Sequence, residues 1–501
     1  MEEKLDILKK RLIEVDDLNS AAALLYWDQS TYMPSGGAVA HGRQMATLGR
    51  LAQEKFIDPE VGKLLDDLKS FEEGLDYDSD DASLIRVSRR NYEKAVNVPP
   101  EWLAKFYEHS SKSYQAWAKA RPENDFKSML PYLEKTLELS RQFADFFPGY
   151  DHIADPLIDN SDYGMKAESI RAIFANLREQ LVPIVQAIAE KPLADNSCIL
   201  QHYPEDEQLA FGLEVAKDYG YDLERGRQDK THHPFMIKFS LGDVRITTRT
   251  KENDLTEALF STTHEAGHAM YEQGINMAFD GLPLADGTSS GVHESQSRLW
   301  ENVVGRSHGF WEHYFPKLQN HFPSQLEKVS LDEFYRAINR VERSLIRTDA
   351  DEVTYNLHVM IRFDLELDML EGNLAIKDLP DAWHARYESD LGLRAPDDVD
   401  GALQDVHWYS GTIGGSFQGY TLGNIMGALF YDAALKTNPA IPDEIKQGKF
   451  ENLHGWLKKN IYQHGAKYTA DELIERVTGG KLNIDPYIQY LRTKYGELYD
   501  L

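Results

Sequence analysis

Apolar residues recur at three- and four-residue steps along most of the chain, and this spacing constrains the fold more than any other feature. Leu5, Leu8, Leu12, Val15 and Leu18 form such a stripe, as expected for one face of a helix. Similar stretches cover residues 79–96, 101–119, 126–147, 167–190 and 331–372. Several exceed the usual length of a globular helix, which favours long helices packed roughly antiparallel to one another. The sequence therefore predicts a mainly α protein.

One segment departs from the helical spacing. Residues 235–240 and 244–248 are rich in β-branched and aromatic side chains, and a turn containing Gly242 separates them. This pattern predicts a β-hairpin. A small sheet that only completes the core is one interpretation. Its position just before the strongest motif of the chain favours a wall of the active site instead.

Nothing in the sequence divides the chain into separate domains. No Pro/Gly/Ser-rich linker, low-complexity tract or fixed-period repeat interrupts it. Hydrophobic residues make up 42% of the chain, enough for a large buried core. We therefore expect residues 1–501 to form a single unit.

Composition limits the classes of binding partner and the cellular compartment that we expect for the protein. Lys and Arg number 54 and Asp and Glu 82, so the formal net charge is −28. Nucleic acids and anionic membranes are bound through clustered positive charge, and neither is expected as a partner. No apolar run approaches the roughly 20 residues of a membrane span. The only cysteine, Cys198, cannot form an intramolecular disulfide, which favours a cytoplasmic protein.

Residues 264–268 read H-E-A-G-H and match the H-E-x-x-H pattern of zinc hydrolases. Residues four apart on a helix project from one face, so His264 and His268 can reach the same ion at about 2.1 Å. Glu265 lies beside the first ligand, where its carboxylate can accept a proton from water. A helix with two surface or hydrogen-bonded core histidines is the alternative until a third ligand is found.

The third ligand is expected in the segment that follows a Gly-rich loop. The extended form of the motif, with a third His, is absent because Tyr271 and Gly274 occupy its positions. Residues 292–300 instead begin a helix capped by Ser289 or Ser290, and Glu294 in its first turn would complete a His₂Glu site. His293 competes with Glu294, since adjacent helical residues point about 100° apart.

Together with further signatures, these residues closely resemble the carboxypeptidase Taq family of metallopeptidases. The segments that match are H-P-F at 233–235, D-V-R-I-T at 243–247, H-E-S-Q-S-R at 293–298, I-R-T-D-A-D at 346–351 and G-A-L-Q-D-V-H-W at 401–408, with W-D-Q at 27–29. They span most of the chain. The family's G-Y-F-P-x-Y stretch differs here, because residues 415–420 read G-S-F-Q-G-Y and keep only the last Tyr.

The resemblance implies a two-lobed helical molecule with a deep groove, similar to neurolysin and angiotensin-converting enzyme. It also implies a homodimer with one Zn²⁺ per subunit, for which Co²⁺ can substitute. The activity it implies is the release of C-terminal amino acids from peptides with broad specificity.

Two polar residues are candidates for stabilising the oxyanion of the tetrahedral intermediate. Similar helical peptidases place a His and a Tyr beside the metal, and His407 and Tyr420 are the corresponding choices here. Each could instead be a hydrogen-bonded polar group of the core. Tyr355 is a weaker rival.

A carboxypeptidase must also bind the free terminal carboxylate, for which the planar guanidinium of Arg is suited. Arg347 is the first choice, on the expected helix 331–372. A structural salt bridge to Asp349 or Asp351 is the alternative, and Arg245 and Arg343 are further candidates.

The hairpin region supplies two more candidates for the substrate site. His233 is expected to shape the wall of the groove without binding metal, because the ligand set is already complete. Arg245 could point into the groove, although pairing with Asp243 is favoured.

Three functions are compatible with these residues. A zinc carboxypeptidase that uses Glu265 as general base is favoured. An endo-oligopeptidase or dipeptidase on the same scaffold would differ only in where the groove is closed. A non-catalytic helical scaffold that binds peptides is disfavoured, because it has no need of a base at position 265.

Overall fold

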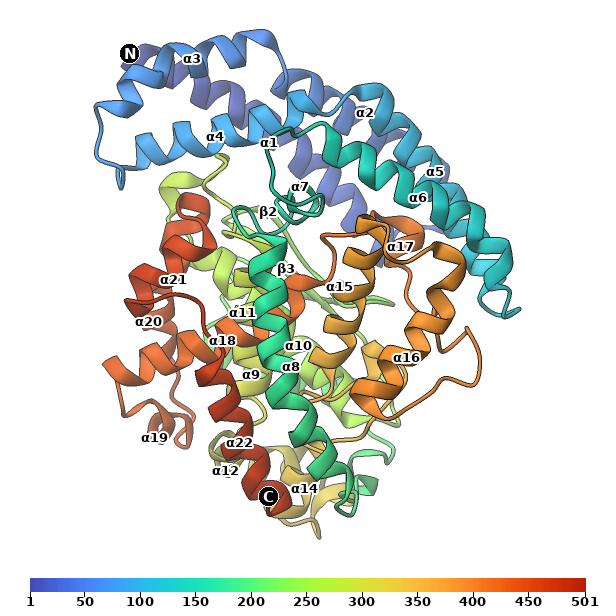
Figure 1. The fold of residues 1–501 in the computed structure, drawn as a ribbon. Helices are drawn as coiled ribbons and strands as arrows, with labels where there is room; N and C mark the ends of the chain where they lie inside the picture. Colours follow the sequence, from blue (N-terminus) through green and yellow to red (C-terminus); the bar gives the residue numbers. More distant parts are fainter.

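The computed structural model describes all 501 residues and is mainly helical (Figure 1). The N-terminal part contains α1 (Glu2–Thr31), α2 (Ala38–Phe56), α3 (Pro59–Glu73), α4 (Asp80–Asn97), α5 (Pro100–Ala120), α6 (Phe126–Asp145), α7 (Asp155–Ile158), α8 (Ala167–Ala189) and α9 (Glu205–Tyr219). The strands are β1 (Gln228–Lys230), β2 (Met236–Ser240) and β3 (Asp243–Thr248).

The remaining helices follow the sheet. They are α10 (Leu255–Gly274), α11 (Ser290–Arg298), α12 (His308–His321), α13 (Pro323–Leu326), α14 (Leu331–Ile338), α15 (Tyr355–Glu371), α16 (Leu379–Leu391), α17 (His407–Ser410), α18 (Gln418–Thr437), α19 (Ile441–Ile445), α20 (Glu451–Asn460), α21 (Ala470–Thr478) and α22 (Asp485–Tyr499). A π-helical turn, Leu299–Val304, continues α11. None of the helices combines the length and the apolarity that crossing a membrane requires.

Most of the expected helices are confirmed. The predicted helix at 79–96 is α4, where the Ser79 hydroxyl accepts a hydrogen bond from the Ala82 amide and so caps the first turn. Helices α5, α6 and α8 match the stretches 101–119, 126–147 and 167–190 within two residues at each end. In α1 the side chains of Leu5, Leu8 and Leu12 are buried, as their spacing predicts.

The prediction of a single long helix over residues 331–372 is wrong. Helix α14 ends at Ile338, and sixteen residues without α-helix precede α15. The Asp351 carboxylate stabilises this connection, because it accepts hydrogen bonds from the backbone amides of Glu342, Val353 and Thr354. Side-chain bonds to the backbone compete with helix formation in this way, and Arg347 consequently lies in a short 3₁₀ turn.

The predicted hairpin is confirmed, and the sheet contains one more strand than expected. β2 and β3 pair antiparallel, with Met236 opposite Ile246 and a bulge after Lys238. β1 pairs parallel to β3 on the other side, which gives the order β1-β3-β2. Val244 and Ile246 of β3 are buried, and the Thr248 hydroxyl donates to the Ala258 carbonyl of α10 at 3.2 Å. The sheet therefore lies against α10.

The apolar core has two parts. The larger extends from Val98 to Tyr499 and includes α10, α11, α15 and α18. The smaller joins α1, α3 and α4 to the segment after α10, through residues such as Ile275 and Phe279. The N-terminal helices α1–α6 form a layer across the top of the molecule in Figure 1, and α5 and α6 contribute side chains to the larger core.

Helices α10, α11 and α18 cross at glycines with almost no space between their backbones. A Cβ atom on Gly267 would lie 2.6 Å from the Gln296 carbonyl oxygen, and one on Gly423 would lie 2.5 Å from Cγ of Glu294. Neither approach leaves room for a methyl group. These two glycines therefore set the position of α11 between its neighbours.

We expect Gly267→Ala and Gly423→Ala each to lower the free energy of unfolding by about 1–3 kcal/mol, because the added methyl group overpacks a backbone crossing. Denaturant titration measures the change. Gly455→Ala is the matched control: this glycine lies within α20 with no atom near its Cβ direction, and alanine should stabilise it by about 0.5–1 kcal/mol. Equal stability changes at all three positions would contradict the packing argument.

Candidate metal centre and active site

The predicted metal-binding residues lie at the crossing of α10 and α11. Asp254 caps α10 by accepting a hydrogen bond from the Thr256 amide at 2.9 Å, and His264 and His268 follow on one face of the helix. Their side chains remain 19% and 16% exposed, so a substrate can reach them. Glu294 comes from the first turns of α11, which Ser289 caps.

The donor atoms of these three residues converge on one point. Nε2 of His264 lies 3.7 Å from Oε2 of Glu294, and Nε2 of His268 lies 3.4 Å from the same oxygen. All three donors are within 4.8 Å of one another. In a tetrahedral site with bonds of about 2.1 Å the ligand atoms are about 3.4 Å apart. The residues therefore fit a metal ion of the size of zinc.

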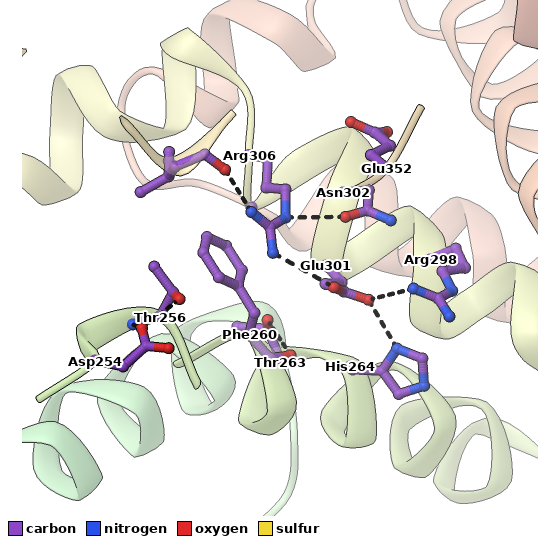
Figure 2. A network of polar contacts seen from close by, with 12 residues as sticks. Asp254, Thr256, Phe260, Thr263, His264, Arg298, Glu301, Asn302, Arg306 and Glu352 are labelled. Atoms are coloured by element: carbon purple, nitrogen blue, oxygen red, sulfur yellow. Dashed lines mark hydrogen bonds and ion pairs between the residues drawn. The ribbon is translucent and has the colours of Figure 1, made fainter. Parts of the chain in front are cut away.

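The atoms of His264 and Glu294 that face away from this point are bound by a charged network. Oε2 of Glu301 accepts a hydrogen bond from Nδ1 of His264 at 2.8 Å and another from Arg298 at 3.2 Å (Figure 2). Arg298 also donates to Oε1 of Glu294 at 2.7 Å and so lies between the two carboxylates. Because the carboxylate can only accept, Nδ1 of His264 carries the proton and Nε2 is free. The network thus holds the ring with Nε2 turned toward the point where the donor atoms converge.

His268 is oriented by a second chain of contacts. Its Nδ1 lies 2.6 Å from Nδ1 of His293, and Nε2 of His293 lies 2.9 Å from the carboxylate of Glu272, which pairs with Lys238 at 2.9 Å. His293, the rival of Glu294 in the sequence, therefore lies behind His268 and not among the converging donor atoms.

Burial and charge set the ionisation of the group. Burial raises the pKa of Glu265 to about 7, and burial lowers the pKa of His268 to about 4, which keeps its imidazole neutral. Burial also opposes the ionisation of Glu294, but the charges of Arg298 and His264 outweigh it and hold the pKa of Glu294 well below its usual range. Glu294 is thus an ionised carboxylate and His268 a neutral imidazole, the forms that bind metal. At His264 burial favours the neutral form, but Glu294 and Glu301 outweigh it and raise the pKa.

His407 and Tyr420 are neighbours in the structure. Nε2 of His407 lies 3.4 Å from the Tyr420 hydroxyl, and Nδ1 of His407 is hydrogen-bonded to Asp405. Burial raises the pKa of Tyr420 to about 12, and Tyr355, Arg347 and Glu294 also act on it electrostatically. Tyr420 precedes Gly423 by one turn of α18, the helix that touches Glu294.

Arg347 pairs with neither of the acidic residues that were expected to hold it. Its Nε donates to Asp405 at 2.7 Å and its Nη1 to the Tyr355 hydroxyl at 3.0 Å. Asp351 is occupied by backbone amides, as described above. The side chain of Arg347 is buried, and Nη2 is the one nitrogen of the guanidinium without a hydrogen bond inside the protein.

The hairpin candidates are placed by the sheet. Arg245 forms two hydrogen bonds with Asp243, at 2.8 and 2.7 Å, and its guanidinium lies over the Trp27 ring, so the structural pairing is present. His233 is exposed and precedes β2. Desolvation lowers the pKa of His233, and the charges of Arg249, Arg347 and His407 act in the same direction.

Several residues of this region were not identified from the sequence. Glu301 follows Glu294 by seven residues, and the spacing of two helical turns could have indicated it. Asp405 lies within the G-A-L-Q-D-V-H-W signature, two residues before His407. Glu272 carried no local signal, because its partners Lys238 and His293 are distant in the sequence.

Glu366 on α15 is a further buried carboxyl group near these residues. The Trp408 indole donates a hydrogen bond to it at 2.8 Å, and burial raises the pKa of Glu366 to about 8. The group is therefore protonated at neutral pH in the folded protein, whereas an exposed glutamate loses its proton near pH 4.5.

We expect the stability of the protein to fall relative to that of Glu366→Gln as the pH rises from about 5 to 8. Over this window the unfolded chain releases the Glu366 proton while the folded chain keeps it, so unfolding becomes more favourable with increasing pH. The difference should reach about 1–4 kcal/mol in denaturant titrations at pH 5 and pH 8. Parallel stability curves for the two proteins would contradict the assignment.

Comparisons with known proteins agree with this geometry. Residues 7–495 match the family model described as carboxypeptidase Taq (M32) metallopeptidase. The chain is 40% identical to thermostable carboxypeptidase 1 of Thermus thermophilus, with 96% of each chain covered, and 34% identical to carboxypeptidase 1 of Bacillus subtilis, with 99% of this chain and 97% of that one covered.

A solved structure shares the whole fold. The crystal structure of an M32 carboxypeptidase from Deinococcus radiodurans superposes with a TM-score of 0.96 at 52% identity, and both chains are covered completely. A match of this extent shows a shared family and a shared architecture. The arrangement of His264, Glu265, His268 and Glu294 is one that suits a metallopeptidase. The chain therefore belongs to the carboxypeptidase Taq (M32) metallopeptidase family and is a metallocarboxypeptidase, a hydrolase of peptides.

Proposed function

We propose that the protein is a zinc-dependent carboxypeptidase of broad specificity in which His264, His268 and Glu294 bind the metal. The observation that supports this most strongly is the convergence of two Nε2 atoms on Oε2 of Glu294 at 3.7 and 3.4 Å. Two imidazoles and a carboxylate form the ligand set of catalytic zinc sites that keep one position open. Cobalt, with similar ligand preferences, would serve in the same site.

Glu265 acts as the general base in this proposal. Its carboxyl group is buried on the same helix as both histidines, and its raised pKa of about 7 suits proton transfer near neutral pH. A bound zinc ion would supply a Lewis acid that polarises the scissile carbonyl and increases the acidity of water. Glu265 would accept the proton of the attacking water and deliver it to the leaving amine.

His407 and Tyr420 stabilise the developing oxyanion. Their polar atoms lie 3.4 Å apart, so a single oxygen that faces both could accept from the Tyr420 hydroxyl and from Nε2 of a doubly protonated His407. Asp405 accepts from Nδ1 of His407 and thereby leaves Nε2 directed toward Tyr420. His233 and Arg245 contribute to the wall of the substrate site on the side of the hairpin.

Arg347 binds the terminal carboxylate of the substrate. Two guanidinium groups, from Arg347 and Arg362, share the single carboxylate of Asp405, so this corner carries an excess of positive charge. Nη2 of Arg347 is free to donate to an incoming carboxylate. Recognition of a free C-terminus at this point would restrict the enzyme to exopeptidase activity.

Two broader features complete the proposal. A homodimer is proposed from the family resemblance. A cytoplasmic location is proposed because Cys198 is the only cysteine, which suits a reducing compartment.

The metal assignment predicts a separation between binding and turnover. His264→Ala, His268→Ala and Glu294→Ala should each lose metal and activity together, because each removes a ligand. Glu265→Gln is the matched control, since it should keep one zinc per chain while kcat falls by about two orders of magnitude or more. Metal content by atomic spectroscopy and peptide turnover measure the two effects. Full metal content in Glu294→Ala together with its loss in His293→Ala would reverse the assignment.

Removing the proposed anchor should abolish the preference for a free C-terminus. We expect Arg347→Ala to lose about 2–4 kcal/mol of transition-state binding, measured as kcat/KM, because a charge-assisted pair disappears. C-terminal amidation of the peptide should impair the native enzyme strongly and the variant little further. Arg245→Ala is the control, because Arg245 is paired with Asp243 and should keep the preference. An equal effect of amidation on native enzyme and Arg347→Ala would assign the anchor elsewhere.

A further inference from the structure

The carboxylate of Asp405 contacts two residues to which the proposed mechanism gives different tasks. Oδ2 accepts from Nε of Arg347 at 2.7 Å and from Nε of Arg362 at 3.0 Å, whereas Oδ1 is hydrogen-bonded to Nδ1 of His407. The proposed anchor of the substrate terminus and the proposed oxyanion donor are therefore bound to opposite oxygens of one side chain.

The surroundings hold Asp405 rigidly. Arg362 is fully buried, and its other nitrogens donate to the Gln404 side chain at 2.8 Å and to the His358 carbonyl at 2.8 Å. Gln404 also accepts from the backbone amide of Arg347 at 3.2 Å. Burial opposes the ionisation of Asp405, but the His407 hydrogen bond and the two arginines outweigh it and hold its pKa well below the usual range. Asp405 is thus a permanently charged acceptor with little freedom to move.

We propose that Asp405 is a positioning residue that fixes the distance between Arg347 and His407, so that a docked terminal carboxylate aligns the last peptide bond with the oxyanion donor. This inference rests on the proposed roles of Arg347 and His407. It adds that the two roles depend on each other through one carboxylate.

The dimensions suit an enzyme that removes one residue at a time. The substrate carboxylate and the last peptide carbonyl belong to neighbouring residues, whose Cα atoms are about 3.8 Å apart. Arg347 and His407 are likewise separated by a single carboxylate group, without a flexible loop between them. Holding the terminus at Arg347 would therefore hold the carbonyl of the preceding residue near His407.

A purely structural role for Asp405 is the alternative, because it neutralises a guanidinium in the core. Such a role predicts that loss of Asp405 impairs stability and every substrate equally. A positioning role predicts instead that the contribution of His407 depends on whether the substrate has a free terminus. The two roles therefore predict different ratios of kcat/KM between free and amidated peptides. A general loss of folded enzyme lowers both values and leaves this ratio unchanged.

The first test leaves Asp405 intact. The cost of His407→Gln in kcat/KM is measured for one peptide with a free C-terminus and for the same peptide amidated. We expect the cost to be about tenfold larger for the free acid, because only that substrate is aligned through Arg347. Equal costs for the two peptides overturn the inference.

The second test removes the link. In an Asp405→Asn background, His407→Gln should cost the same for both peptides, and Asp405→Asn itself should reduce kcat for the free acid about tenfold or more with zinc content unchanged. Glu366→Gln is the matched control: Glu366 is buried one turn from Arg362, contacts neither Arg347 nor His407, and should keep both the activity and the acid-to-amide ratio. An unchanged dependence on the peptide terminus in Asp405→Asn overturns the inference.

The outcome for Arg347→Ala separates this inference from the function on which it rests. If Arg347→Ala loses the preference for free acids while His407→Gln costs the same for both peptides, the anchor is correct and the coupling is wrong. If Arg347→Ala keeps the preference, the anchor is wrong and the inference fails with it.

Discussion

The whole site depends on the contact of three helices at positions without side chains. Gly267 lets the backbone of α11 approach α10, and Gly423 lets α18 approach the side chain of Glu294. A ligand set drawn from two helices needs their axes fixed to a fraction of an ångström, because metal–ligand bonds vary little in length. Backbone against backbone supplies that precision better than long side chains, which can change rotamer. At this crossing the geometry of the proposed metal site and the packing of the core are thus one property.

Charge around the proposed metal centre is arranged in pairs that extend outward from it. Arg298 lies between Glu294 and Glu301, and Lys238 neutralises Glu272 behind His293. A buried charge without a partner would cost several kcal/mol, so each ionised group needs its neighbour. The charges around Asp405 are arranged differently. Arg347 and Arg362 share this one carboxylate and leave positive charge in excess. That excess of positive charge suits the anionic substrate terminus that is proposed to bind there.

Local sequence was a good guide where local interactions decide the structure. The H-E-A-G-H helix, the hairpin and the capped helix α4 follow from spacing, turn residues and a serine, all within a few positions. Prediction failed between residues 339 and 354, where the apolar spacing suggested helix but Asp351 binds the backbone of its own connection. It also missed the partner of Arg347, since Asp405 is 58 positions away and nearer acids were available. Pairings of this kind depend on how distant segments pack, which no local pattern records.

The π-helical turn at Leu299–Val304 limits how the length of this segment can change. One residue more or less between Glu294 and Glu301 would rotate everything beyond it by about 100°. Glu301 would then leave His264, and Arg306 would leave the face of the Phe260 ring, over which it lies at 3.5 Å. Substitutions along the turn alter single contacts, but an insertion or deletion would displace two of them at once. The segment is therefore free to vary in composition but not in length, and a functional homologue should align across it without a gap.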